Sequence, residues 1–236
     1  DPALIPLTPS GPPKKQYALL AFLVAMGLGI GAALVRDRIR EGIRTLNELQ
    51  QRSYLLGLGV TPFFKGTLTQ QLEDSTSLYQ QMLNSIQDVL TYGHVSVRAR
   101  TMLITSAEKG EGKTTLAISL ACSFGARGKR TLLIDCDPHN PSVLSNLDNN
   151  QDDGKNFVRN ALPNVDVYVP SQVNGHSALN FQLLYEFISA ETSIYDKIII
   201  DTPPLLGFPE ASILANMVEG VIMAVKWHCT SANIVI

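Results

Sequence analysis

One stretch of this chain, Ile104–Thr115, limits the possible fold more than any other. It reads Ile-Thr-Ser-Ala-Glu-Lys-Gly-Glu-Gly-Lys-Thr-Thr and continues an apolar run. A strand that ends in a glycine-containing loop and then opens a helix is typical of a phosphate-binding loop, here with Ala107 in place of the first glycine. Gly110 and Gly112 let backbone N–H groups converge on phosphate oxygens, because neither residue carries a Cβ. The stretch therefore predicts a nucleoside triphosphate site.

The residue types of this loop suggest separate roles. We expect Lys113 to reach the β- and γ-phosphates and the Thr114 hydroxyl to bind Mg²⁺, while the following helix presents its positive end. The predicted ATP-binding residues are Ala107, Gly110, Glu111, Gly112, Lys113, Thr114 and Thr115. The alternative is a glycine-rich surface turn with a chance lysine. Two further motifs argue against that alternative.

Both of these motifs are apolar segments that end in aspartate. Thr131–Asp137 reads Thr-Leu-Leu-Ile-Asp-Cys-Asp, and Lys197–Pro204 reads Lys-Ile-Ile-Ile-Asp-Thr-Pro-Pro. Ligands of open α/β sheets bind at the carboxyl ends of strands, so Asp135, Asp137 and Asp201 are expected beside the loop. Asp201 suits a water-mediated contact to Mg²⁺. For the first motif, a strand followed by an Asx turn is the alternative.

Strand-like and helix-like segments alternate in this part of the chain. Helices are expected at Thr114–Arg127 and Ala178–Ala190, and a further strand at Gly220–Val225. Such alternation predicts a parallel sheet with helices on both faces. The predicted fold is an α/β P-loop NTPase sheet, preceded by a transmembrane helix.

The transmembrane prediction rests on Tyr17–Val35, an uncharged stretch of suitable length for a bilayer. Basic residues are in excess after it, which places that side in the cytoplasm. A buried core helix and a signal peptide are the alternatives.

The domain organisation follows from this span. We expect a periplasmic Pro-rich stalk at 1–15, the transmembrane helix at 16–35, cytoplasmic juxtamembrane helices and a linker at 36–97, and the ATP-binding domain at 98–236. Within the third segment, a linker is expected at Gly57–Gly66 and an amphipathic helix near Asp74–Val89. The chain is interpreted as a piece of a longer protein.

Charge and metal-ligand spacing argue against two classes of partner. The net charge of −2 gives no electrostatic reason to expect a nucleic acid. The four histidines and three cysteines lack the spacing of metal ligands.

In order and spacing, the motifs resemble those of the bacterial tyrosine kinases of exopolysaccharide and capsule export. In that family a polysaccharide co-polymerase is fused to its kinase. The resemblance covers the Pro-rich stretch, the span with its basic flank, Thr105–Thr114, Leu133–Asp137 and Ile200–Pro204. It implies tyrosine autophosphorylation in trans within a ring of identical subunits, using ATP and Mg²⁺. It also implies an inner-membrane protein, with a cytoplasmic ATP-binding domain, that works with polysaccharide polymerase and export proteins.

The same resemblance implies residue roles. Lys113 would contact the phosphates, and Thr114, Asp135 and Asp201 would organise the metal. Asp137 would lie near the incoming tyrosine hydroxyl and accept its proton.

The chain departs from the pattern of that family in four places. His139 stands where an arginine is usual, and Lys109 where a proline is common. A subunit-joining Glu-x-x-Arg-x-x-Arg pattern has its best match in Gln81, Asn84 and Gln87, which carry no charge. A C-terminal tyrosine cluster is absent from the printed sequence.

These departures leave two alternatives to the kinase. One is a membrane-tethered ATPase of the partitioning and septum-positioning type, which would carry a signature lysine at the position of Glu108. The other is a non-catalytic ATP-binding scaffold of the export machinery. Retention of all three motif aspartates argues against the scaffold.

Overall fold

The computed structural model describes residues 14–39, 55–64, 66–74, 76–93, 99–147, 156–170 and 179–227. The chain divides between residues 42 and 43 into two compact units, and each is described by itself. Residues 1–13 of the predicted stalk and residues 40–54 of the predicted juxtamembrane segment lie outside the described residues, and the last two stalk positions, Lys14 and Lys15, belong to a helix instead.

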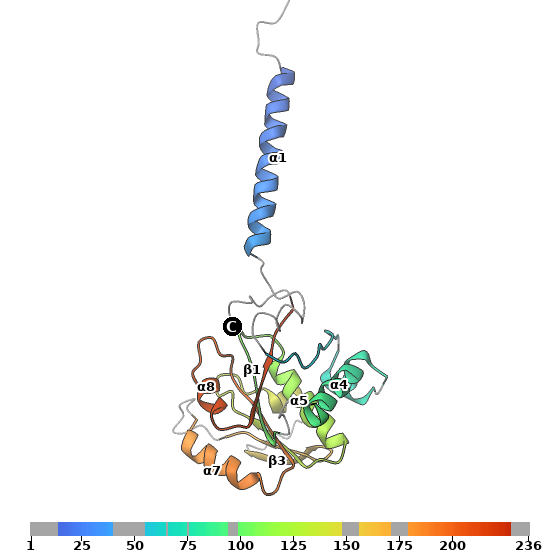
Figure 1. Ribbon diagram of the computed structural model, residues 1–236, viewed down its shortest axis with the longest axis vertical. Helices are drawn as coiled ribbons and strands as arrows, with labels where there is room; N and C mark the ends of the chain where they lie inside the picture. Colours follow the sequence, from blue (N-terminus) through green and yellow to red (C-terminus); the bar gives the residue numbers. More distant parts are fainter. Residues whose placement is uncertain are drawn as a thin grey trace, which may run out of the picture. The chain divides into compact units, whose positions relative to one another are not determined.

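The first unit contains a single described helix, α1 (Lys14–Ile39), drawn in blue in Figure 1. Within it, Lys15–Leu34 is long and apolar enough to cross a membrane, by length and composition. The helix extends past the uncharged stretch at both ends. It takes in the basic flank because arginine and lysine are good helix formers.

The second unit is built on a six-stranded sheet of order β3-β4-β2-β5-β1-β6. The strands are β1 (Thr101–Ser106), β2 (Thr131–Asp135), β3 (Phe157–Leu162), β4 (Val165–Tyr168), β5 (Lys197–Asp201) and β6 (Gly220–Ala224). All pairings from β4 to β6 are parallel. The predicted α/β P-loop fold is therefore confirmed.

The edge strand β3 is antiparallel to β4 and was not predicted. Pro163 and Asn164 join the two strands, and Asn164 has a φ of 60°, a conformation that asparagine tolerates better than most residues. So tight a turn can only reverse the chain direction. Arg159 and Asn160 interrupt the apolar pattern of β3, which explains why the sequence did not reveal it.

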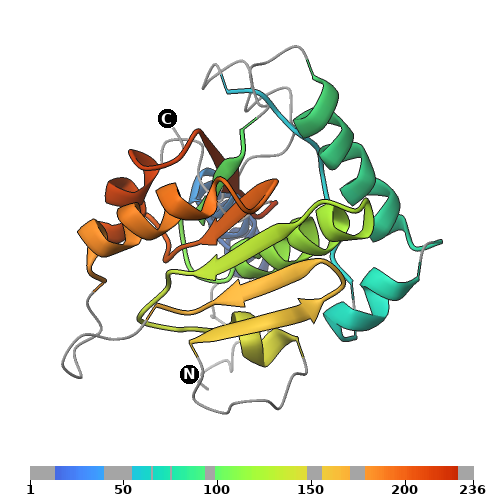
Figure 2. The same ribbon diagram turned by 90° about the horizontal axis from the view of Figure 1, so that it is seen from below.

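Helices cover both faces of the sheet (Figure 2). On one face lies α5 (Lys113–Ala126), and α3 (Leu68–Glu73) and α4 (Leu78–Tyr92) pack against it. On the other face lie α7 (Phe181–Glu191) and α8 (Glu210–Ala215). A single turn, α6 (Val143–Asn146), follows β2. The predicted helices at 114–127 and 178–190 correspond to α5 and α7.

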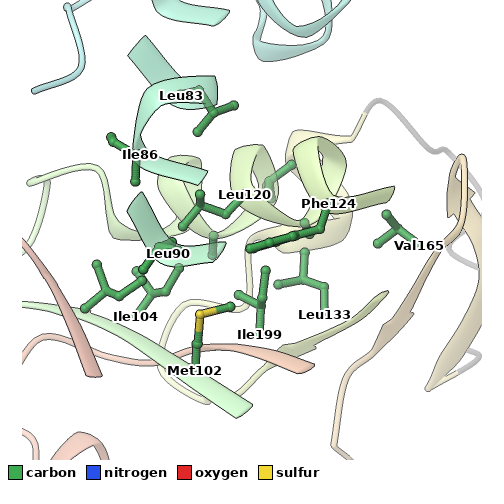
Figure 3. Close-up of a cluster of buried hydrophobic side chains, with 14 of the residues drawn as sticks. Leu83, Ile86, Leu90, Met102, Ile104, Leu120, Phe124, Leu133, Val165 and Ile199 are labelled. Carbon is green, nitrogen blue, oxygen red and sulfur yellow. The ribbon is translucent and has the colours of Figure 1, made fainter. Parts of the chain in front are cut away.

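Successive side chains of the central strands point to opposite faces of the sheet, as in any pleated strand, and each face has its own hydrophobic core. In β1, Met102 and Ile104 face α5, whereas Leu103 faces the α7 side. Figure 3 shows Leu120 and Phe124 of α5 between the strand side chains and those of α4. Helix α5 is thus buried between the sheet and α4, and its position is fixed from both sides.

The segment before β1 packs onto this core. Residues 55–64 form neither helix nor strand, as a linker predicts, but Leu58 and Phe64 pack against the core. The ring of Phe64 meets Tyr79 of α4 edge-on, with centroids 4.8 Å apart. Helix α4 starts at Leu78, later than predicted, because the Ser77 hydroxyl caps it by accepting a hydrogen bond from Gln80 N–H. Both α4 and α5 therefore belong to the same compact unit.

Candidate nucleotide-binding site

The predicted phosphate-binding loop connects β1 to α5. Gly110 and Gly112 have φ values of 84° and 89°, in the left-handed region that favours glycine. Gly112 immediately precedes α5, whose first residue is Lys113. The first N–H groups of a helix have no partner within the helix, and they carry the positive end of its dipole. The loop thus presents donors and positive potential where phosphates would bind.

Glu111 connects this loop to the segment that follows β6 in the same chain. Its Oε2 accepts a hydrogen bond from Glu108 N–H (2.7 Å), and its Oε1 accepts one from Lys226 N–H (3.3 Å), just after β6. The Ser106 hydroxyl donates to the Glu108 carbonyl (2.7 Å). The Glu111 carboxylate therefore supports the loop backbone, and its contact with ATP stays a prediction.

The loop after β5 is fastened to the start of the phosphate loop. Thr202 Oγ1 donates to the Ile104 carbonyl (3.0 Å), and Leu205 N–H donates to the Ser106 carbonyl (2.8 Å). Thr105 Oγ1 donates to the Pro203 carbonyl (3.2 Å). These bonds hold the end of β5, and so Asp201, beside α5.

Asp201 is buried next to the first turn of α5. Thr114 Oγ1 donates to Asp201 Oδ2 (2.7 Å). The other oxygen, Oδ1, is buried without a hydrogen-bond partner among the described residues. Burial raises the pKa of Asp201 to about 7, although the Lys113 cation acts in the opposite direction.

This arrangement fits the predicted Mg²⁺. A buried acceptor oxygen beside a hydroxyl can hold a hydrated Mg²⁺, which takes one or two protein ligands and completes its shell with water and phosphate. Within the described part of the chain, no three His, Cys, Asp or Glu side chains gather as a metal cage. The Asp201–Thr114 pair therefore suits a Mg²⁺ ion that is also bound by the phosphates of the nucleotide.

Lys113 and Asp137 form an ion pair at the mouth of the loop. Lys113 Nζ lies 3.0 Å from Asp137 Oδ2, and the two side chains are only 12% and 5% exposed. The other Asp137 oxygen accepts hydrogen bonds from His139 N–H (3.2 Å) and Asn140 N–H (3.1 Å). The turn after β2 thus aims a carboxylate at the lysine that is expected to bind phosphate.

The Asp135 carboxylate accepts hydrogen bonds from backbone N–H groups of the segment that follows β2. Its Oδ1 accepts from Asp137 N–H (3.2 Å), and its Oδ2 accepts from Ser142 N–H and Val143 N–H (2.9 Å each). Burial raises the pKa of this carboxyl group. Asp135 therefore shapes the loop that carries Asp137, and its predicted contact with Mg²⁺ stays a prediction.

His139, which replaces the arginine usual in the resembling family, joins two loops. Its Nε2 lies 3.1 Å from Glu210 Oε1, in the first turn of α8. Its ring packs on Phe208, with centroids 4.3 Å apart. The contact links the loop after Asp137 to the segment after Asp201. Sequence reasoning missed Glu210 and Phe208 because no spacing signal connects residues some seventy positions apart.

Four of the predicted site residues make direct side-chain contacts, in two pairs: Lys113 with Asp137, and Thr114 with Asp201. Ala107 is buried at the base of the loop, and the backbone carbonyl of Thr115 accepts a hydrogen bond from the Ser119 hydroxyl.

The amide pattern on α4 does not form one outward surface. Gln81 is exposed, Asn84 is half-buried, and Gln87 is buried against α5. Gln87 Oε1 accepts a hydrogen bond from the Ser123 hydroxyl (2.5 Å). Gln87 therefore serves the packing of α4 on α5, and an interface through all three amides is not supported.

Comparisons with known proteins identify a nucleotide-binding domain in this chain. Residues 102–225 match the family model described as the CobQ/CobB/MinD/ParA nucleotide binding domain. The tyrosine-protein kinase YwqD of Bacillus subtilis is 29% identical over 169 residues, which are 66% of this chain and 71% of that protein. The tyrosine-protein kinase wzc of Salmonella typhi is 24% identical over 262 residues, covering 96% of this chain and 36% of that protein.

A solved structure shows the same fold. The kinase domain of the Escherichia coli tyrosine kinase ETK superposes with a TM-score of 0.66 at 17% identity, covering 82% of this chain and 87% of that one. The resemblance to bacterial tyrosine kinases is therefore confirmed. The chain spans about a third of the length of wzc.

Proposed function

This chain belongs to the CobQ/CobB/MinD/ParA family of nucleotide-binding domains, and we propose that it uses bound ATP as a protein tyrosine kinase that phosphorylates copies of itself. The similar proteins named tyrosine-protein kinases support this choice of reaction. The observation that carries the proposal is Asp137, a carboxylate held 3.0 Å from the phosphate-loop lysine, where a proton acceptor for an incoming hydroxyl is needed.

In the proposed reaction, Lys113 and the loop N–H groups bind the triphosphate. A tyrosine oxygen forms a bond to the γ-phosphorus while the bond to the β–γ bridging oxygen breaks, which releases ADP. Asp137 accepts the phenolic proton. Mg²⁺, held by Thr114 and Asp201 with Asp135 close by, would offset the charge of the carboxylates and phosphates.

We further propose that the protein is anchored in a bacterial inner membrane. The length and apolar composition of α1 support an anchor, and the basic residues after it favour a cytoplasmic ATP-binding domain. Regulation of exopolysaccharide or capsule polymerisation and export, in a homo-oligomer that works with the export proteins, rests on the family resemblance.

A partitioning-type ATPase is the second candidate. The family model takes its description partly from MinD and ParA, and this favours hydrolysis of ATP by water. The phosphate loop argues against it, since Glu108 occupies the signature-lysine position. Rapid release of phosphate without labelled protein would support this candidate.

The kinase proposal is tested by phosphotyrosine formation in the intact chain with ATP and Mg²⁺. We expect phosphotyrosine in the wild type and none in Lys113→Met. Asp137→Asn preserves shape and frees Lys113, so it should bind ATP at least as tightly as wild type while phosphotyrosine forms about 100-fold more slowly. A wild-type chain that binds ATP but keeps phosphotyrosine at background would refute the proposal.

A further inference from the structure

The tyrosines of this chain differ in their ability to accept phosphate. The sequence contains seven, of which Tyr54 lies outside the described residues and Tyr17 lies within α1. Tyr79 and Tyr195 are buried, and their hydroxyls are within hydrogen-bond distance of Ser119 Oγ (2.7 Å) and Asp166 Oδ2 (2.6 Å). Neither hydroxyl can enter another active site without disrupting the core.

Tyr168 is held by aromatic neighbours. Its ring lies between Phe157 and Phe187, with centroid distances of 6.0 Å and 4.4 Å. The second contact bridges β4 and α7, so release of Tyr168 would open the interface between the sheet and that helix.

Among the described tyrosines outside α1, Tyr92 and Tyr185 remain, and Tyr92 is the better placed. Tyr92 is 79% exposed, and Tyr185 is 50% exposed. Tyr185 lies in the interior of α7, where presenting its backbone to a kinase site requires unwinding on both sides. Tyr92 is the last residue of α4 and is followed by Gly93. Helix ends open at much lower cost than helix interiors.

An ion pair lies one helical turn before Tyr92, on the same side of α4. Asp88, one turn before Tyr92, pairs with Arg127 at the end of α5. Residues four apart lie on the same side of a helix, so Tyr92 projects from the Asp88 side of α4. Lys129 and Arg130, both exposed, continue the basic turn after α5.

We propose that Tyr92 is a phosphoacceptor of this chain and that its phosphate draws Arg127 away from Asp88. The proposal rests on the kinase function proposed above. The γ-phosphoryl group passes from ATP to the Tyr92 oxygen, ADP leaves, and the phenolic proton goes to Asp137 of another copy.

The modification would change the end of α4. A phosphate with charge near −2 at a helix C-terminus opposes the helix dipole and repels Asp88. Arg127 offers a bidentate, charge-assisted contact in compensation. The last turn of α4, which buries Leu90, would then depend on the phosphate–Arg127 pair.

The test maps phosphotyrosine by mass spectrometry after incubation of the chain with ATP and Mg²⁺. Tyr92→Phe is compared with Tyr185→Phe, the matched exposed control, and with Lys113→Met. We expect phosphate on Tyr92, loss of most phosphotyrosine in Tyr92→Phe, wild-type levels in Tyr185→Phe and none in Lys113→Met.

Two failures are distinguishable. If Tyr92→Phe retains wild-type phosphotyrosine on other residues, the Tyr92 inference is overturned and the kinase stands. If the wild type forms no phosphotyrosine, both are overturned.

The role of Arg127 is tested separately by thermal unfolding. Phosphorylation should lower the Tm more in Arg127→Gln than in the wild type, and equal shifts in the two proteins would exclude a role for Arg127.

Discussion

Three carboxylates share the candidate site with the phosphate-loop lysine. Asp135, Asp137 and Asp201 are all nearly inaccessible to solvent, and Lys113 is paired with the second of them. Without a further cation, this excess of negative charge would repel a triphosphate. Burial, and to a lesser extent the charges of Asp135 and Asp137, raise the pKa of Asp201.

Asp201→Asn should stabilise the nucleotide-free chain in a pH-dependent way. The pKa of Asp201 is raised from an ordinary 3.8 to about 7, so ionisation costs folding free energy that accumulates as the pH rises between these values. Urea unfolding without Mg²⁺ should show the variant more stable than wild type at pH 8, by on the order of a few kcal/mol, and less so at pH 5. Glu186→Gln, an exposed control, should show no such trend, and a gain independent of pH would contradict the account.

At this scale the sequence predicted well where local pattern governs position. Lys113 contacts Asp137, and Thr114 contacts Asp201, because a glycine loop and two strand ends fix where these residues lie; their roles stay predictions. The partners His139 and Glu210 were not predictable, since only the tertiary fold brings their loops together.

At the scale of elements, the α4–α5 interface contains buried polar contacts among apolar side chains. The Tyr79 hydroxyl and Gln87 Oε1 contact the hydroxyls of Ser119 and Ser123, one helical turn apart on α5. Such pairs fix the register of two helices, since a slip would leave buried groups without partners. Helix α4 is thereby coupled to the helix that opens at the phosphate loop.

Ser123→Ala should destabilise the chain by about 1–3 kcal/mol, because it leaves the buried Gln87 oxygen without its donor. Adding Gln87→Leu to it should recover part of the loss, since both polar partners are then absent. Denaturant unfolding of the two single variants and the double variant measures this coupling. Strictly additive losses would show that the contact carries no coupling energy.

Element prediction succeeded where periodicity was uninterrupted. The central strands β1, β2 and β5 are short apolar runs that are buried on both faces of the sheet. Helix α5 is rich in apolar residues and is largely buried. Strand β3 and helix α8 escaped prediction because a half-exposed edge strand and a six-residue helix provide too little pattern.

At the scale of the whole molecule, α1 determines where the chain is expected to reside. In bacterial cells, we expect the protein in the membrane fraction, resistant to salt and alkaline carbonate and released by detergent. Placing two aspartates in the helix, Leu23→Asp with Ile30→Asp, should shift it toward the soluble fraction, at about 2.5–3.5 kcal/mol per charge. Wild-type protein extracted by salt alone would contradict an anchor.

The fate of the γ-phosphate tests the central claim most directly. The intact chain is mixed with ATP labelled in the γ-phosphate and with Mg²⁺, and label on tyrosine is compared with free phosphate over the first turnover. The account predicts that label reaches tyrosine before phosphate is released and that Lys113→Met abolishes both. Release of all the label as free phosphate, with none on tyrosine, would contradict the account and identify an ATPase.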